Sequence, residues 1–423
     1  MPKTVEKKYS IGQAVVNIGV VGHVDHGKTT LVHAITGEWT DRHSEEIKRG
    51  ISIKLGYSDI TIFKCPKCSE PESYTTKNLS PDLKCLKCGV ELVPERKISF
   101  VDAPGHEVLM ATVISGASLM DGALLIIAAN EKCPQPQTRE HLAVLQITGI
   151  KNIIIVQNKA ELVSEKEALE NYKQIKQFVK GTVAENAPII PTSAIFKKNI
   201  DLVLYAIQKY IPTPKRDDSK PLLMYVTRSF DVNKPGCEPK DLQGGVLGGS
   251  IIQGKLKVGD VIEVRPGIKI DKSGVSTYNP ITTTVTSLQG GGVYLEEARP
   301  GGLIGVGTKL DPSLTKADGF IGNMVGKSDS LPPVLDELTL TVNLMQRVVG
   351  TNELLQVDNI QLKEPLMVNV GAAVTVGVVT KVSSNQITLK LKRPVCGEPN
   401  QRVAISRQIK GRWRLIGWGE LIA

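Results

Sequence analysis

The 423-residue chain is poor in aromatic residues and has no apolar stretch long enough to cross a membrane. Phe, Trp and Tyr make up 4% of it, so stacking on aromatic rings is not expected to dominate any contact with nucleic acid. The longest apolar runs, such as Ala123–Ala129, have the length of a strand, whereas a spanning helix needs about 20 residues. The first residues, MPKTVEKKYS, lack the apolar core of a signal peptide. We therefore expect a cytoplasmic protein without membrane contact.

Cysteine is also scarce, and its seven copies cannot all pair in disulfides, which favours a reducing compartment. Cys133, Cys237 and Cys396 are scattered along the chain and are expected to be structural. Two CxxC pairs at the observed spacing predict a tetrahedral Zn²⁺ site with all four positions filled, and therefore a structural one. Four thiols left without metal are the alternative. The four predicted zinc ligands are Cys65, Cys68, Cys85 and Cys88.

Apolar runs alternate with amphipathic helical stretches in the first half of the chain. Continuous apolar runs are typical of strands buried on both faces of a parallel sheet, and the alternation predicts an α/β domain with right-handed crossovers. The predicted strands are Val15–Val21, Ile98–Asp102, Ala123–Ala129, Ile153–Gln157 and Ile189–Thr192, with helices at Thr138–Ile147 and Glu165–Val179.

The pattern changes after Ile211-Pro212-Thr213-Pro214, where two prolines and a charged run indicate a linker. Beyond it, short alternating runs are separated by glycine and proline turns, which is typical of small β-barrels. A second break falls near Pro332-Pro333. We predict an α/β domain of mostly parallel strands over 1–213, with a zinc knuckle inserted at 62–96, followed by β-barrels over 214–332 and 333–423.

The segment Gly22–Thr29, GHVDHGKT, matches the phosphate-binding pattern GxxxxGK[ST] and stands between a predicted strand and a helical stretch. In such a loop, backbone amides and the positive end of the following helix face the phosphates. Lys28 is expected to reach the β- and γ-phosphates, and Thr29 to bind Mg²⁺. A chance match is the alternative, and the strand–loop–helix setting argues against it.

Loops after three later strands complete a predicted nucleotide site. Asp102 is expected to hold the metal through water, and the amide of Gly105 to meet the γ-phosphate. The NKAE motif that ends at Glu161 offers a carboxylate to guanine N1–H and its amine, so we predict that the site binds GTP. The predicted nucleotide-binding residues are Asp25, His26, Gly27, Lys28, Thr29, Thr30, Asn158, Lys159, Glu161, Ser193, Ala194 and Ile195.

The motifs GHVDHGKT and DAPGH together resemble the elongation-factor-like translational GTPases. That resemblance implies that His106 orients the attacking water, so the predicted catalytic residues are His106, Asp102 and Gly105. It also implies that the RGISI segment is the first switch, with Ser52 in place of the family's threonine as a Mg²⁺ ligand. Asp25 and the backbone of Gly50 are implied ligands of a second metal ion. Glu161 departs from the family's NKxD motif by one methylene, and no arginine finger stands out, which implies slow intrinsic hydrolysis.

Longer segments resemble the gamma subunits of archaeal and eukaryotic translation initiation factor 2, and the two CxxC pairs favour the archaeal form. The resemblance implies a carrier of methionylated initiator tRNA that acts with alpha and beta subunits on the small ribosomal subunit and its mRNA, and that releases the tRNA after hydrolysis. The beta subunit would dock on the GTP domain and the alpha subunit on the second domain. The segments that carry the resemblance are Cys133–Thr138, Ser229–Gly236, Pro300–Asp318 and Gly411–Gly419.

The formal net charge of +9 favours a polyanionic partner such as RNA, although a basic solvated surface is the alternative. Basic residues of the second half could meet tRNA phosphates as a cluster, whereas Trp413 and Trp418 are expected to be core residues. The cluster comprises Lys234, Arg265, Arg393, Arg402, Arg407, Lys410, Arg412 and Arg414.

Three other functions remain open at this point. A carrier of elongator or selenocysteinyl-tRNA would share the phosphate and switch motifs, although the zinc knuckle and Ser229–Gly236 argue against it. The regulatory GTPase of sulfate adenylyltransferase would share the barrels and need no tRNA. A scaffold would bind GTP without turning it over.

Overall fold

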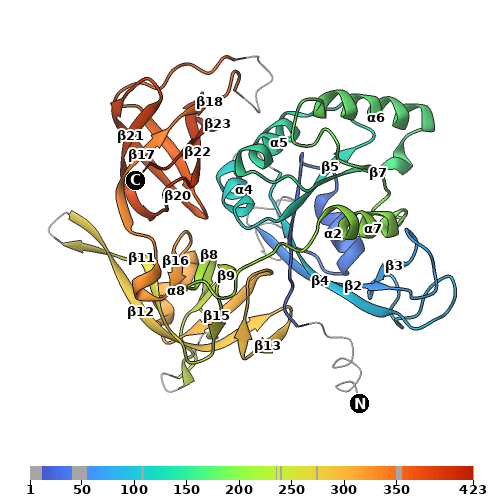
Figure 1. The fold of residues 1–423 in the computed structure, drawn as a ribbon, viewed down its shortest axis with the longest axis horizontal. Coiled ribbons are helices and arrows are strands. Elements are labelled where there is room, and N and C mark those ends of the chain that lie inside the picture. The colour runs from blue at the N-terminus through green and yellow to red at the C-terminus, as the bar shows by residue number, and fades with distance from the viewer. Residues whose placement is uncertain are drawn as a thin grey trace. The chain divides into compact units, whose positions relative to one another are not determined.

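The computed structural model describes residues 12–40, 55–105, 109–234, 236–238, 241–272, 275–348 and 355–422. The chain divides after Pro214 into two compact units. The first contains an open sheet covered by helices, and the second contains two β-barrel-like domains (Figure 1). None of the helices in the described ranges has the length and apolar character needed to cross a bilayer.

A sheet with the strand order β3-β2-β4-β1-β5-β6-β7 forms the centre of the first unit. The neighbouring strands β4, β1, β5, β6 and β7 pair in parallel, whereas β2 and β3 are antiparallel additions at one edge. The predicted α/β domain of mostly parallel strands is therefore confirmed. The strands are β1 (Asn17–Gly22), β2 (Gly56–Lys64), β3 (Tyr74–Thr76), β4 (Val93–Asp102), β5 (Gly122–Ala128), β6 (Ile153–Asn158) and β7 (Ile189–Pro191).

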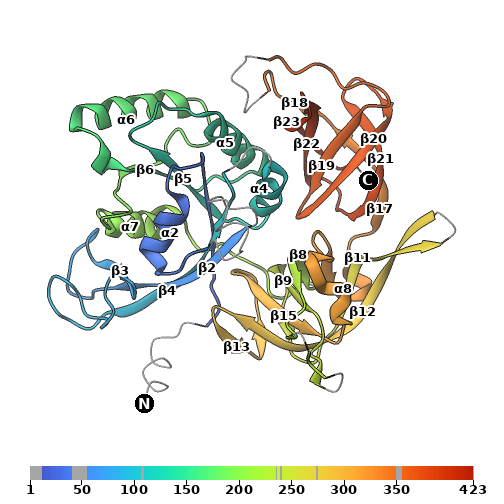
Figure 2. The same ribbon diagram turned by 180° about the vertical axis from the view of Figure 1, so that it is seen from behind.

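Helices cover both faces of this sheet (Figures 1 and 2). Leu31 of α2 and Leu204 of α7 share one buried core with Ile18 of β1, because each of these helices turns an apolar stripe towards the strands. The remaining helices α4, α5 and α6 lie over the opposite face. The helices are α2 (Lys28–Thr36), α4 (Met110–Ala117), α5 (Pro136–Thr148), α6 (Glu165–Val179) and α7 (Ile200–Tyr210), with a 3-10 turn η2 at Ala160–Leu162.

The cysteine-containing insertion grows out of the sheet as a small lobe. β2 and β4 pair antiparallel as far as Lys64 and Val93, and β3 adds to the outer side of β2. Phe63, Leu83 and Leu92 form a core of their own with two of the cysteines. The lobe is therefore continuous with the central sheet.

In the second unit, the first barrel closes because β11 pairs with both β16 and β12. The second barrel runs in the order β17-β21-β20-β19-β22-β23-β18. Each encloses its own apolar core, which confirms the two predicted β-barrels. The elements are β8 (Leu223–Phe230), β9 (Val246–Gln253), β10 (Leu256–Lys257), β11 (Val261–Lys272), β12 (Val275–Gly290), β13 (Val293–Leu295), β14 (Glu297–Ala298), β15 (Ile304–Thr308), α8 (Pro312–Thr315), η4 (Lys316–Asp318), β16 (Met324–Gly326), η5 (Ser328–Ser330), β17 (Val334–Thr341), β18 (Asn343–Leu344), β19 (Pro365–Val370), β20 (Ala373–Val382), β21 (Gln386–Cys396), β22 (Arg402–Ile409) and β23 (Arg412–Glu420).

Candidate nucleotide and metal sites

The loop between β1 and α2 carries the phosphate-binding motif at the carboxyl edge of the parallel strands. Gly22 has a φ of 147°, and a Cβ atom there would lie 2.3 Å from the carbonyl oxygen of Ile126. Gly27 has a φ of 85°, and a Cβ atom there would lie 2.4 Å from Nδ2 of Asn158. Both positions require glycine, because a side chain would collide with the neighbouring strand or loop.

Two motifs that are far apart in the sequence meet at the start of α2. Lys28 Nζ donates a hydrogen bond to the carbonyl oxygen of His23 at 2.8 Å, and Thr29 Oγ1 donates to Asp102 Oδ2 at 2.9 Å. A Cβ atom on Gly105 would lie 2.5 Å from Lys28 Nζ, so the DAPG loop lies directly against the lysine. The lysine, hydroxyl, carboxylate and close glycine backbone are the groups with which P-loop GTPases hold phosphates and Mg²⁺.

Thr40 is a further residue of this site that sequence reasoning missed. Its Oγ1 donates a buried hydrogen bond of 2.6 Å to Asp102 Oδ2, the same oxygen that accepts from Thr29. Thr40 belongs to no motif, so only the fold reveals its contact. The two hydroxyls fix the orientation of the Asp102 carboxylate.

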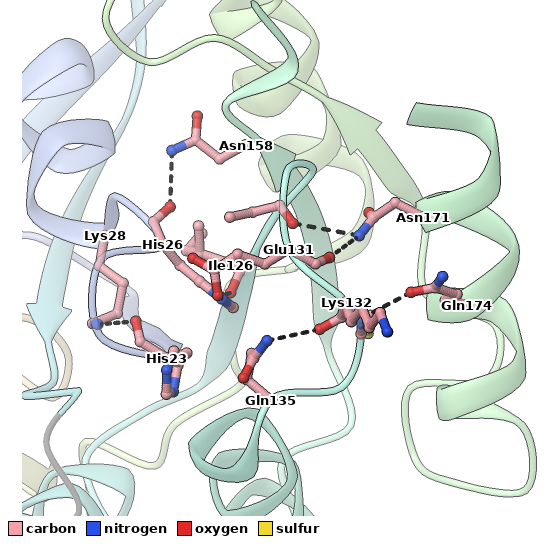
Figure 3. A network of polar contacts seen from close by, with 12 residues as sticks. His23, His26, Lys28, Ile126, Glu131, Lys132, Gln135, Asn158, Asn171 and Gln174 are labelled. Carbon is pink, nitrogen blue, oxygen red and sulfur yellow. Dashed lines mark hydrogen bonds and ion pairs between the residues drawn. The ribbon is translucent and has the colours of Figure 1, made fainter. Parts of the chain in front are cut away.

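Asn158 joins three loops of the predicted base site. Its Nδ2 donates to the carbonyl oxygen of His26 at 3.0 Å (Figure 3), and its Oδ1 accepts from the amide of Ala194 at 3.1 Å. Nearby, Glu161 and Ser193 contribute to the walls of a pocket of about 270 Å³. Oε2 of Glu161 is buried and has no hydrogen-bond partner within the described part of the chain, so its capacity to accept a hydrogen bond is unused.

Two buried histidines pack against the phosphate loop and the adjacent strand β5. The amide of Gly22 donates to Nδ1 of His141 at 2.7 Å, and Nδ1 of His26 lies 2.9 Å from the carbonyl oxygen of Ile126. Burial lowers the pKa of His26 to about 4 and that of His141 to about 3. Both rings are therefore neutral near pH 7. The 3.4 Å approach of the Glu131 carboxylate to His26 is accordingly not an ion pair at that pH.

The loop that follows β5 is fastened to α6 (Figure 3). Asn171 Nδ2 donates to the carbonyl oxygen of Glu131 at 2.7 Å, and Gln174 Oε1 accepts from the amide of Cys133 at 2.9 Å. This loop places the Glu131 carboxylate beside the ring of His26. Helix α6 therefore holds a segment that contacts the phosphate loop, although α6 itself lies outside the motif.

The remaining predicted nucleotide residues lie on the same loops. Asp25 and Lys159 have left-handed backbones with φ of 62° and 61°, Thr30 lies in the first turn of α2, and Ile195 is 68% exposed beside Ala194. The positions predicted for the first switch and for catalysis, Gly50, Ser52 and His106, lie outside the described residues.

The four cysteines of the two CxxC pairs converge in the lobe. Sγ of Cys65 lies 3.4 Å from that of Cys88, and Sγ of Cys68 lies 3.6 Å from those of Cys85 and Cys88. A tetrahedral Zn²⁺ with bonds of about 2.3 Å separates its sulfur ligands by roughly 3.8 Å, so the cluster is compatible with zinc. Burial acts to raise the pKa of the Cys65 thiol, but the amides of Lys67 and Cys68 together with the thiols of Cys88 and Cys85 lower that pKa to about 6. The same contacts between the sulfurs raise the pKa of the Cys68 thiol to about 12.

Half of the basic residues predicted to contact tRNA are engaged in contacts within the second unit or are buried there. Arg265 donates to the carbonyl oxygen of Leu331 at 3.1 Å, and Arg393 donates to that of Ile321 at 2.9 Å. Arg407 pairs with Glu364, and Arg414 is 6% exposed. The exposed members of the cluster are Lys234, Arg402, Lys410 and Arg412.

The two tryptophans of the second barrel, Trp413 and Trp418, are half-buried, not core residues. Trp418 packs under the guanidinium of Arg402, whose Cζ lies 4.7 Å from the ring centroid. This stacking holds one exposed member of the basic cluster in place.

Family models account for most of the chain. "Elongation factor Tu GTP binding domain" matches residues 13–213, "Elongation factor Tu domain 2" matches 244–321, and "Initiation factor eIF2 gamma, C terminal" matches 336–421. Among solved structures, a bacterial selenocysteine-specific elongation factor has a TM-score of 0.72 at 24% identity, covering 97% of this chain and 58% of its own. The elongation factor SelB of Methanococcus maripaludis with the GTP analogue GppNHp has a TM-score of 0.70 at 23% identity, covering 98% and 80%. At such identities these structures show a shared fold alone.

Curated relatives match at much higher identity. Translation initiation factor 2 subunit gamma of Pyrococcus horikoshii is 62% identical over 407 residues, which cover 96% of this chain and 97% of the relative. The protein of the same name from Methanocaldococcus jannaschii is 59% identical over 415 residues, which cover 98% and 99%. The chain therefore belongs to the gamma-subunit family of archaeal translation initiation factor 2, and it is a GTPase of translation initiation.

Proposed function

We propose that the chain, in its GTP state, carries methionylated initiator tRNA to the small ribosomal subunit and its mRNA, and releases it after GTP hydrolysis. The observation that carries this proposal is the 62% identity to a translation initiation factor 2 gamma subunit over 97% of that relative's length. The segment proposed as the first switch, which contains Ser52, would supply the GTP-dependent change on which such a cycle depends. Alpha and beta subunits of the factor are the proposed permanent partners, and the cytoplasm is the proposed location.

In the proposed hydrolysis, this chain's groups position GTP and the attacking water. Lys28 binds the β- and γ-phosphates, the amide of Gly105 meets the γ-phosphate, and His106 orients the water. Mg²⁺, when bound, offsets the negative charge that builds up on the phosphate oxygens. Its proposed ligands are Thr29 and Ser52, with Asp102 acting through water, and Asp25 and the Gly50 backbone are proposed ligands of a second ion.

On the base side, selection of guanine is supported by the buried Oε2 of Glu161, which has no hydrogen-bond partner among the described residues. Guanine presents N1–H and an amine to this acceptor, whereas adenine presents an unprotonated N1. Competition of GTP, XTP and ATP for the same site checks the proposal. Xanthine replaces the amine with an oxygen, so XTP and ATP are both expected to compete more than tenfold more weakly than GTP, given the cost of leaving a buried acceptor unpaired. Equal competition by ATP would remove the basis for a guanine site.

We further propose that the cysteine cluster holds one structural Zn²⁺ through Cys65, Cys68, Cys85 and Cys88. The distances between the four sulfurs support this assignment. The domain limits 1–213, 214–332 and 333–423 remain predictions. Elemental analysis of the purified chain is expected to give one zinc per molecule, and Cys88→Ser is expected to lower that content.

The decisive experiment for the carrier function is tRNA discrimination. The assembled alpha, beta and gamma subunits are incubated with methionylated initiator or elongator tRNA in GTP or GDP and retained on filters. We expect retention of initiator tRNA that depends on GTP. Equal affinity for both tRNAs would defeat the initiation function, and no GTP-dependent retention at all would favour a metabolic GTPase. His106→Ala is expected to leave retention intact and to lower ribosome-stimulated phosphate release.

A further inference from the structure

The lobe that carries the cysteines reaches back to the helix that follows the phosphate loop. Thr76 Oγ1 donates a buried hydrogen bond to the carbonyl oxygen of Ile35 at 2.7 Å. Asn78 Nδ2 donates to the carbonyl oxygens of Ala34 at 2.8 Å and His33 at 3.2 Å. These three acceptors form the last turn of α2, whereas both donors belong to the insertion.

The last carbonyls of an α-helix have no partners within the helix and must find them elsewhere. α2 has only nine residues, and a helix of this length is marginal without support from its surroundings. Its own C-cap supplies a single bond, from the amide of Gly37 to His33. The lobe supplies the donors to Ile35 and Ala34 and lies so close that a Cβ atom on Gly37 would be 2.9 Å from Asn78 Oδ1.

The capping segment is connected to the cysteine cluster by a compact turn. Ser80 Oγ donates to the carbonyl oxygen of Lys84 at 2.6 Å, and the amide of Leu83 donates to that of Ser80 at 3.1 Å. Cys85 follows directly, and its amide bonds to the carbonyl oxygen of Val90 at 2.8 Å. Ordering of the four cysteines therefore orders the turn that presents Asn78 to α2.

At its other end, α2 begins with Lys28 and Thr29, the residues proposed to bind phosphate and Mg²⁺. Loss of the donors at its last turn removes support from this marginal helix as a whole, and its first turn carries the phosphate-binding residues. We propose that Thr76 and Asn78 are positioning residues of the nucleotide site and couple metal binding in the lobe to nucleotide affinity. The proposal rests on the nucleotide and zinc roles given above. Because coupling between two binding sites is reciprocal, nucleotide must strengthen metal binding by the same factor.

The first experiment measures binding of Mg·GDP to the full-length chain by calorimetric titration. Asn78→Ala and Thr76→Val each remove donors to α2 and are expected to weaken binding on the order of threefold to tenfold, the equivalent of one or two ordinary hydrogen bonds. Thr76→Ser keeps the hydroxyl and is expected to restore the affinity. Glu72→Gln is the matched control, since the exposed Glu72 pairs with Lys87 within the lobe. Hydrogen exchange of the α2 amides is expected to accelerate in the first two variants and not in the control.

The second experiment tests the coupling itself. Zinc is removed with a chelator from the unmodified chain and from the double variant Thr76→Val/Asn78→Ala, and GDP affinity is measured before and after. Zinc removal is expected to weaken GDP binding in the unmodified chain and to have a smaller effect in the double variant. A cap variant that binds GDP like the unmodified chain, or an equal effect of zinc removal in both proteins, overturns the proposal. Failure of the zinc-loaded unmodified chain to bind GDP would instead overturn the proposed function.

Discussion

Gly27 is one of two positions at which the phosphate loop tolerates no side chain. A methyl group there would push against the Asn158 amide, which joins the phosphate loop to the loop of Ala194. Gly27→Ala is therefore expected to lower the affinity for Mg·GDP at least on the order of tenfold, because it separates the phosphate loop from the base loop. Titration calorimetry of the full chain measures the effect.

A matched control at Gly181 distinguishes the effect of backbone strain from that of a steric collision of the added methyl group. Gly181 has a similar left-handed φ of 74°, and a Cβ atom there meets nothing within 4 Å. Gly181→Ala is expected to cost about 1 kcal/mol of stability through strain alone and to leave GDP affinity unchanged. Similar GDP affinities for the two variants would show that the contact with Asn158 is unimportant.

His141 is expected to make the stability of the first unit depend on pH. Burial lowers its pKa to about 3, whereas the unfolded chain has a value near 6.5, so between these values the unfolded state binds more protons. Stability is then fully present above pH 6.5 and falls as the pH is lowered towards 3, by about 1.4 kcal/mol for each pH unit within this window. His23, His26 and Lys28 act in the same direction on this ring. His141→Gln, which cannot titrate, is expected to show a shallower fall.

Urea unfolding of the nucleotide-free chain at pH 7.5, 6.0 and 5.0 checks this expectation. The glutamine variant is also expected to lose about 1 kcal/mol at pH 7.5, because the Gly22 amide loses a well-placed acceptor. His26 is retained in both proteins, so its own contribution cancels. Identical pH dependence in the two proteins contradicts a neutral, buried His141.

Several site residues could be predicted from the sequence because each stands at the end of an apolar run. Asp102 and Asn158 are the last residues of β4 and β6, and parallel strands bring their carboxyl ends to one edge. Thr40 and His141 could not be predicted, because their contacts join residues 62 and 119 positions apart and belong to no motif. Long-range packing alone places them.

At the scale of elements, strands β2 and β3 escaped prediction for a similar reason. β2 buries only Ser58, Ile62 and Phe63 fully, since it lies towards the edge of the sheet and carries the lobe. Its sequence therefore lacks both the continuous apolar run of a central strand and a strict alternation. The cysteine spacing predicted the metal site of the lobe but not its antiparallel framework or its contact with α2.

Arg96 of β4 joins the lobe, helix α7 and the start of the linker. Its guanidinium donates to the carbonyl oxygens of Ile207 at 3.1 Å and Ile211 at 2.8 Å, and it lies 3.3 Å from Thr213 Oγ1. Arg96→Lys keeps the charge but cannot reach all three oxygens, so we expect a loss of roughly 1–3 kcal/mol. Hydrogen exchange followed by mass spectrometry is expected to show faster exchange at residues 207–214.

Lys209 provides the control for Arg96 on the same helix. Its amine contacts the exposed Tyr205 hydroxyl at 3.0 Å, and loss of an exposed contact of this kind changes stability by less than about 0.5 kcal/mol. Lys209→Ala is therefore expected to leave exchange at residues 207–214 unchanged. If Arg96→Lys behaves in the same way, the arginine does not hold the linker.

At the scale of the whole molecule, the linker predicted at Ile211–Pro214 coincides with the break between the two compact units. The sequence indicated this division because the proline-rich linker separates two hydrophobic patterns. The pattern before it includes helical stretches, and the pattern after it is that of short strands. It did not indicate that the two barrels share a contact core, because that core is assembled from single residues of several strands. Leu223, Met324 and Leu331 of the first barrel form it with Cys396 of the second.

This shared core predicts how the second unit unfolds. Besides the apolar cluster, Arg393 donates to the carbonyl oxygen of Ile321 and Gln401 Nε2 donates to Tyr225 Oη at 3.4 Å. A fragment of residues 215–423 is therefore expected to unfold in one cooperative transition by circular dichroism and calorimetry, with equal calorimetric and van't Hoff enthalpies. Arg393→Ala leaves the carbonyl of Ile321 without its donor and is expected to lower that transition or to split it in two. Two separate transitions in the unmodified fragment would mean that the barrels are independent, and the polar contacts between them would then contribute little to the stability of the unit.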